Sequence, residues 1–162
     1  MTETIPFDAA RADPPAGSFP AVCVYAGEDG TSHLVDLALP VVGRTQGADG
    51  VTHWTGLEGA RQWGVIVSDG SAYGRWHTAS QVGLSIVLHG AWEIEAGSGQ
   101  RRVLPAGSVL LMLDTTGQGH RSQLVSDRPC AVMGVALDET TTGRFQSLLR
   151  SSLGPDAASP RL

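Results

Sequence analysis

Apolar and polar residues alternate along most of this chain in short runs that turns interrupt. Such alternation puts every second side chain on the same face of an extended strand. Glycine, aspartate and proline cluster between the runs, as in GEDG at 27–30 and SDRP at 126–129. Evenly spaced short strands of this kind predict an all-β sandwich or barrel. The strand candidates are 21–26, 32–39, 62–70, 73–90, 109–114 and 130–137.

The clearest hairpin covers residues 91–104. Its first strand directs Trp92 and Ile94 to one face and Glu93 and Glu95 to the other, and GSGQ forms the turn. In the strand candidate 32–39, one face is formed by His33, Val35, Leu37 and Leu39. One face of each strand is therefore expected to be buried.

Only residues 139–151 have the spacing of an amphipathic helix. Thr140 or Thr141 is the expected N-cap because a hydroxyl can accept a hydrogen bond from a free N–H of the first turn. The apolar side of this helix is formed by Phe145, Leu148 and Leu149.

The length of 162 residues predicts one domain with a substantial core. Residues 1–19 are rich in proline and aspartate and predict a loosely held N-terminal arm. Residues 20–152 then form the β domain with its C-terminal helix. Residues 153–162 predict a flexible tail.

Composition excludes several functions. The net charge of −5 disfavours binding to a phosphate backbone, so we expect no nucleic-acid partner. All eleven basic residues are arginine, which excludes Schiff-base chemistry and a phosphate-loop lysine. No apolar run reaches the roughly 20 residues of a membrane span, and no signal peptide is evident, so we expect a cytoplasmic protein without a membrane partner. Cys23 and Cys130 are then expected to be reduced.

Two motifs stand out in the central third of the chain. The first motif, WHTASQVGLSIVLHG, contains His77 and, 13 positions later, Gly90. In the second motif, PAGSVLLMLDTTGQGH, a turn and a strand precede Gly117 and His120. These stretches resemble the two sequence motifs of the cupin superfamily. The resemblance implies a cupin-type antiparallel β-barrel (a double-stranded β-helix, or jelly roll) around a small-molecule site.

The resemblance also implies a metal site of three histidines and one carboxylate, from which this chain departs. Ala79 stands at the position of the second histidine and Gly83 at that of the acidic residue. His77 and His120 remain and could hold a divalent metal such as Fe, Zn, Mn or Ni. With two neutral ligands, we expect that binding to be weak.

The two histidines can also act without a metal. If 77–83 is a strand, then His77 and Gln81 point to one face, and a neighbouring strand can bring His120 to the same interior. Imidazole titrates near neutral pH and can serve as acid and base, while the amide of Gln81 can hold a substrate. The alternative is that both histidines are hydrogen-bonded interior residues without a chemical role.

Several other residues could have either a functional or a structural role. Asp114 has the same alternation as His120 and could be a site acid, but we favour a role in binding turn amides at a strand end. His33 and His53 could complete a metal shell, although we favour surface or packing roles for both. Arg75 and Arg121 could bind an anionic substrate, but we expect them to be solvated. The tryptophans could line an apolar pocket or pack in the core or an interface: Trp54, Trp63, Trp76 and Trp92.

The sequence thus predicts a small-molecule-binding cupin, which we interpret as an enzyme for isomerisation, elimination or cyclisation. His77 and His120 would transfer protons, and Gln81 would orient the substrate. A metal-dependent oxygenase is one alternative, and a non-catalytic ligand-binding or sensing protein is another. We also expect a homodimer, which the resemblance implies for a small barrel.

Overall fold

The computed structural model describes residues 18–41, 43–46, 52–55, 59–69, 74–154 and 157–161. Within 43–46 and 52–55 only the backbone is described. Most of the expected N-terminal arm lies outside these ranges, and its last two positions, Ser18 and Phe19, already belong to the first strand.

Strands account for most of the described chain, followed by one helix. They are β1 (Ser18–Ala26), β2 (Ser32–Pro40), β3 (Gly43–Gln46), β4 (Thr52–Thr55), β5 (Ala60–Ser68), β6 (Gly83–His89), β7 (Ala91–Ala96), β8 (Arg101–Pro105), β9 (Val109–Met112), β10 (His120–Leu124), β11 (Cys130–Leu137) and α1 (Glu139–Ser152).

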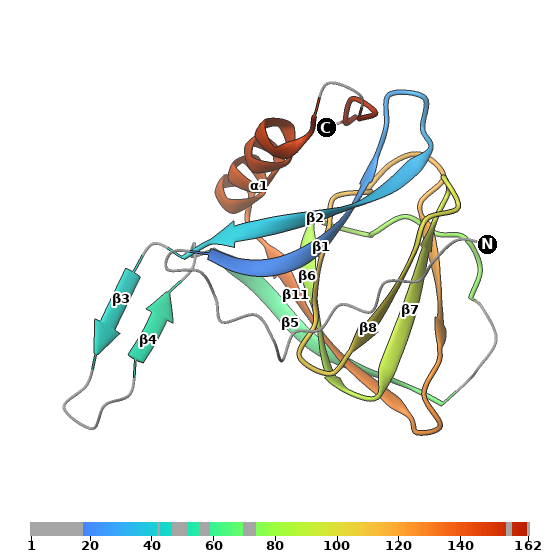
Figure 1. Ribbon diagram of the computed structural model, residues 1–162, viewed down its shortest axis with the longest axis horizontal. Coiled ribbons are helices and arrows are strands. Elements are labelled where there is room, and N and C mark those ends of the chain that lie inside the picture. Colours follow the sequence, from blue (N-terminus) through green and yellow to red (C-terminus); the bar gives the residue numbers. More distant parts are fainter. Residues whose placement is uncertain are drawn as a thin grey trace.

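Two sheets carry the fold. One has six strands in the order β2-β1-β9-β6-β11-β5, and the other has three in the order β10-β7-β8. The two sheets face each other, while β3 and β4 form a separate hairpin beside them (Figure 1). This arrangement confirms an all-β, jelly-roll-like fold with a C-terminal helix. In the described residues, the sheets do not close into a continuous barrel.

The inner core fills the space between the two sheets. Val22 and Val24 of β1 meet Leu110 of β9 there, together with Ile94 and Leu104 from the smaller sheet. All five side chains are fully buried. The alternation along β7 places Ile94 inside, so the hairpin prediction is confirmed in both its strands and its facing.

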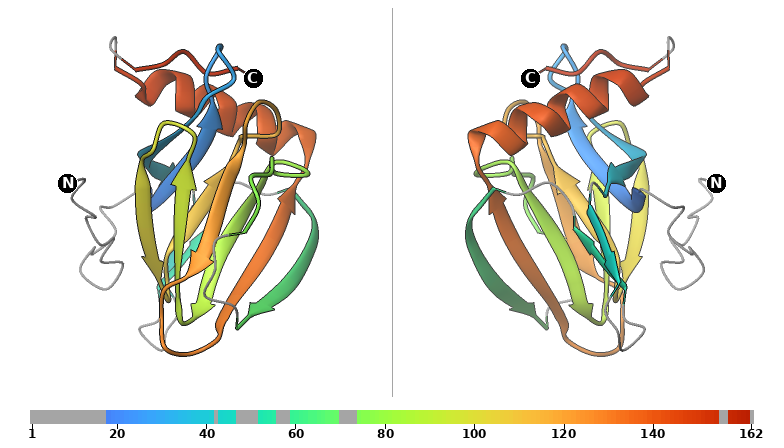
Figure 2. Two further views of the ribbon diagram at one scale, coloured as in Figure 1. Left: turned by 90° about the vertical axis from the view of Figure 1, so that its right-hand side faces the viewer. Right: turned by 90° about the vertical axis from the view of Figure 1, so that its left-hand side faces the viewer.

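A second core lies on the outer side of the six-stranded sheet, under α1 (Figures 1 and 2). Cys23 of β1 and Leu111 of β9 point to this side, where Phe145 and Leu149 of the helix cover them. Since residues of a strand alternate, β1 and β9 contribute to both cores. Cys23 therefore lies in a different core from Cys130, and both cysteines are unpaired and buried.

Helix α1 has the expected position but a different cap. The N-cap is Asp138, whose Oδ1 accepts a hydrogen bond from the N–H of Thr141 at 2.8 Å. The predicted caps Thr140 and Thr141 are wrong because β11 ends at Leu137 and the helix begins one residue after Asp138. No helix of the described chain is long and apolar enough to cross a membrane.

Two other expectations differ from the structure. The run 73–90 was expected as one extended strand, but only Gly83–His89 forms a strand, and residues 74–82 are irregular. In the expected flexible tail, the N–H of Arg161 donates to the carbonyl of Ala26 at 2.7 Å, and Ser159 accepts from Glu28 at 2.9 Å. The tail is held against the turn between β1 and β2.

Candidate functional site

The structure brings His77 and His120 side by side. Their backbones exchange two hydrogen bonds: the N–H of His77 donates to the carbonyl of His120 at 2.9 Å, and the reverse bond measures 2.8 Å. The imidazole centroids are 4.5 Å apart, with the ring planes inclined by 58°. His120 is 2% exposed at the start of β10, while His77 is exposed. The two motif histidines thus converge from segments 43 positions apart in the sequence.

Glycine permits this close approach. Gly119 adopts φ +73°, a left-handed conformation that other residues rarely take. A Cβ atom at this position would overlap the carbonyl group of His77. The cupin-like motif includes Gly117 of the same loop, but Gly119 is the residue that lets the two histidine backbones pair.

Asp114 is the buried partner of His120. Its Oδ2 lies 2.6 Å from Nδ1 of the imidazole, and the side chain has no exposed surface. The role favoured from sequence, binding of turn amides, is wrong: the carboxyl group points inward because Asp114 continues the alternation of β9. Its other oxygen, Oδ1, is buried and makes no hydrogen bond to the described residues.

Burial dominates the electrostatics of Asp114. Loss of hydration raises the pKa of this carboxyl group, and the hydrogen bond and charge of His120 oppose that effect only in part. The carboxyl group therefore binds a proton more readily than an exposed aspartate. Its negative charge, when present, is compensated mainly by one imidazole.

The hydrogen bonds of the two imidazoles determine which ring nitrogen atoms are available for proton transfer. Nδ1 of His77 lies 2.9 Å from the carbonyl oxygen of Arg75, and since a carbonyl only accepts, Nδ1 carries the hydrogen. When Asp114 is ionised, Nδ1 of His120 is likewise the donor. In both rings Nε2 is then left to accept or donate a proton.

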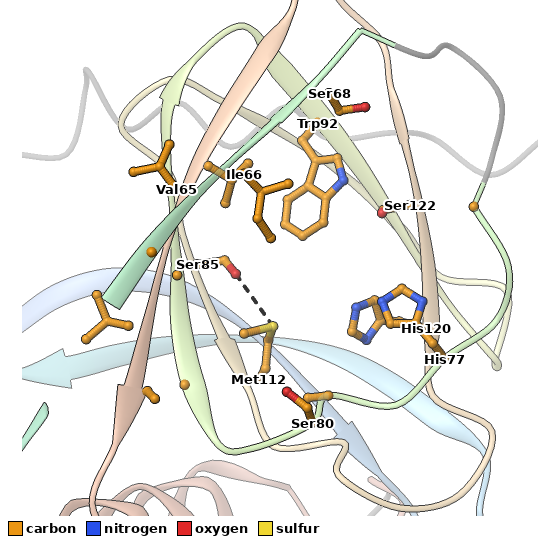
Figure 3. Close-up of a pocket in the computed structure, with 18 of the residues that line it drawn as sticks. Val65, Ile66, Ser68, His77, Ser80, Ser85, Trp92, Met112, His120 and Ser122 are labelled. Atoms are coloured by element: carbon orange, nitrogen blue, oxygen red, sulfur yellow. Dashed lines mark hydrogen bonds between the residues drawn. The ribbon is translucent and has the colours of Figure 1, made fainter. Parts of the chain in front are cut away.

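Both histidines line a pocket of about 660 Å³ between the two sheets. That size falls in the range of small-molecule sites. Figure 3 shows the imidazoles together at one side of the pocket, with Trp92 and Ile66 across from them. The polar residues of this lining include His77, His120, Ser80, Gln81 and Ser122, and the apolar ones include Ile66, Trp92, Met112, Leu124 and Val132.

Gln81 lines the pocket, but not for the reason that predicted it. Residues 78–82 do not form a strand, so side-chain alternation does not fix the direction of Gln81. The residue is exposed, whereas Ala79 is 7% exposed and belongs to the same lining. Its role in binding a substrate stays a prediction.

The residues present do not fit a resident metal ion. In the part of the chain that is described, no three His, Cys, Asp or Glu side chains form a group that could hold one. His33 stacks on Tyr25, with ring centroids 5.5 Å apart, and Tyr25 belongs to the outer core. The side chain of His53 lies outside the described residues. Protein metal sites normally use three or more protein ligands, so two imidazoles alone are a poor site.

The arginine beside His120 does not enter the pocket. Arg121 pairs with Glu95, with Nη2 2.9 Å from Oε2, and its guanidinium lies 5.0 Å from the ring centroid of Trp76. It is thus held against the outer face of the smaller sheet rather than simply solvated. Arg75 is exposed, as expected.

No family model matches this chain, and no curated protein matches its sequence. The fold and the geometry of the pocket are therefore the basis for inferring a function.

Proposed function

We propose that this chain is a cupin-type enzyme that moves protons on a small molecule, in an isomerisation, elimination or cyclisation. The observation that supports this most is the series Asp114–His120–His77, which begins at a buried carboxyl group and ends in the pocket. Both imidazoles have Nδ1 engaged, so Nε2 of each is the atom available for chemistry.

In this proposal His120 is the base. Its Nε2 takes a proton from the carbon beside a substrate carbonyl, and the electron pair of that C–H bond forms the enol double bond. Protonated His77 donates to the carbonyl oxygen, which balances the charge. Where a C=C bond adjoins the deprotonated carbon, the product is a dienol. His120 then delivers its proton to the far carbon of that C=C bond while the enol O–H returns its proton to His77, which completes the isomerisation and restores both histidines. Asp114 keeps the tautomer of His120 that leaves Nε2 free, and Gln81 holds or polarises the carbonyl.

Hydrogen–deuterium exchange can test this without knowledge of the natural substrate. The methyl protons of 2-acetylnaphthalene lie beside a carbonyl, and their replacement by deuterium in D2O is visible by proton NMR. We expect the protein to accelerate exchange, and His77→Ala and His120→Ala to reduce the acceleration about a hundredfold or more.

His89→Ala is the matched control. This histidine bonds to the carbonyl of Pro129 and does not line the pocket, so its removal should leave the exchange rate unchanged. Equal rates in wild type, His77→Ala and His120→Ala would overturn the catalytic proposal. Binding of the ketone with no acceleration would instead identify a non-catalytic binding protein.

We also propose that two copies associate through β5. This strand forms one edge of the six-stranded sheet and pairs only with β11 among the described residues. Trp63, Val65 and Val67 occupy alternate positions of β5 and are 69%, 50% and 67% exposed, and Val67 does not line the pocket. Free edges are commonly protected by charge or proline, yet Arg61 is the only charged residue in 60–68. Antiparallel pairing with a second β5 would cover both the edge and the apolar face.

A further inference from the structure

The pocket that the proposed function uses has no described charged side chain other than its histidines. None of the arginine, aspartate or glutamate side chains that the structure describes lines it. The chain has no lysine, and nine of its eleven arginine side chains lie in the described part, the exceptions being Arg11 and Arg44. Burial raises the pKa of the Cys130 thiol, which also lines the pocket, so this group is neutral.

The nearby charges are already compensated elsewhere. Arg121 and Arg101 both contact Oε2 of Glu95, at 2.9 Å and 3.3 Å, on the outer face of the smaller sheet. Behind His120, the carboxyl group of Asp114 is negative when ionised. An anionic ligand at the histidines would therefore lose hydration and meet no permanent cation, because an imidazole is positive only while it carries a second proton. It would also be repelled by Asp114 when that carboxyl group is ionised.

The rest of the wall is suited to an apolar body. Trp92 presents its ring to the pocket, and Ile66 lies beside it (Figure 3). Val132 and Leu124 extend the same apolar surface. The volume of about 660 Å³ equals that of roughly 20 water molecules, so a ligand with one or two rings can enter.

We propose that the ligand is an uncharged carbonyl compound with a bulky apolar body. The carbonyl lies at His77 and His120, and the apolar body packs against Trp92 and Ile66. Carboxylates and phosphate esters of the same size are rejected. This inference rests on the proposed function for the location of the site, but it adds which chemical class the site selects.

A matched pair of probes tests the class. 2-Acetylnaphthalene and 2-naphthoate have the same ring system and the same number of non-hydrogen atoms, but only the second carries a charge. Equilibrium dialysis at pH 8 measures both affinities directly. We expect the ketone to bind at least about 10-fold more tightly than the carboxylate. Equal or tighter binding of 2-naphthoate would overturn the inference while leaving the pocket and its histidines in place.

Substitutions at two neighbouring residues of β5 test where the apolar body of the ligand lies. Ile66 lines the pocket, whereas Val67 does not, and the two are 69% and 67% exposed. Ile66→Ala should weaken binding of the ketone about 5-fold, and Val67→Ala should leave it unchanged. Equal effects of the two substitutions would show that the apolar body does not lie against β5, which would overturn this placement.

A charge added at the rim should reverse the preference. Ser80 lines the pocket and is exposed, so Ser80→Arg can be accommodated without disturbing the core. We expect this variant to bind 2-naphthoate at least about 10-fold more tightly than wild type does. If neither probe binds wild type, the pocket itself is not a ligand site and the proposed function fails as well. If the ketone is preferred but does not exchange its protons, only the catalytic proposal fails.

Discussion

The two sides of the pocket are built differently. On the histidine side, Asp114 and His120 are 0% and 2% exposed, and paired backbone hydrogen bonds fix His77 against His120. On the opposite side, β5 is exposed along its whole length, and Ile66 faces the pocket with 69% of its surface accessible. Packing thus holds the polar groups in one geometry, while the side chains of β5 have few packed neighbours.

This difference suits the two sides to different tasks: precise placement of reacting groups on the histidine side, and adjustment to the shape of a ligand on the β5 side. Proton transfer requires donor and acceptor atoms within hydrogen-bond reach, so reacting groups benefit from a rigid surrounding. A strand with few buried contacts opens at lower cost and can adjust to the shape of a ligand. We therefore expect substitutions on the histidine side to change rates, and substitutions on β5 to change affinity or association.

The largest effect should come from Asp114→Asn. An amide can donate to Nδ1 of His120, which would move the imidazole hydrogen to Nε2 and remove the base. We expect the rate of deuterium exchange into 2-acetylnaphthalene to fall about a hundredfold, with the same circular dichroism spectrum as wild type. An unaltered rate would mean that Asp114 has only a packing role.

Gly119→Ala should disturb the same side through the backbone. The added methyl group would overlap the carbonyl of His77 at a residue with φ +73°. Relief of this overlap must separate the two histidine backbones, at a cost of about 1–3 kcal/mol in the free energy of unfolding. Chemical denaturation measures this cost. Gly99→Ala is the control, because Gly99 also has positive φ but its Cβ would meet no atom within 4 Å. Equal losses in both variants would assign the whole effect to the glycine conformation.

A smaller effect concerns pH. The raised pKa of Asp114 means that the folded chain retains this proton to a higher pH than the unfolded chain. Its contribution to stability is therefore greatest below the ordinary aspartate pKa of about 4, and it declines as the pH rises toward the folded value. Urea-unfolding midpoints should show this decline in wild type but not in Asp114→Asn. Parallel curves for the two proteins from pH 4 to pH 7 would contradict it.

The least effect on folding is expected on β5. Val67→Lys places a charge on the edge strand at a residue that is 67% exposed and does not line the pocket. We expect the free energy of unfolding to change by no more than about 0.5 kcal/mol, while light scattering shows loss of the dimer. Val125→Lys is the control, because Val125 is 41% exposed outside any strand. A monomeric wild type would refute the association through β5.

The local pattern of apolar and polar residues predicted the bounds of the last strand and the buried faces of two others. The last strand was expected at 130–137 and is Cys130–Leu137, and the alternation in β7 and β2 gave the correct buried faces. The N-cap was displaced to Asp138 because the expected caps lie inside the helix, which begins immediately after that residue. The error in the position of the cap is two or three residues.

The features that the sequence did not predict depend on contacts between segments far apart in the chain. The irregular segment 74–82 looks strand-like, but in the described structure only His77 forms a bridge to another segment. The pairing of Asp114 with His120 could have been found, since both have the same alternation and are six residues apart. The position of Ile66 opposite the histidines depends on how the two sheets face each other, and no local pattern encodes that.

The register of β9 has a consequence for the evolution of this chain. Leu111 points to the outer core, Leu110 and Asp114 point to the interior, and six positions separate Asp114 from His120. Loss or gain of one residue between Leu110 and Asp114 would turn the carboxyl group to the wrong face, whereas a substitution there would leave its direction unchanged. Descendants of a common ancestor should therefore vary in sequence but keep this length. The spacing D-x-x-G-x-G-H, rather than overall identity, is the feature by which distant relatives can be recognised.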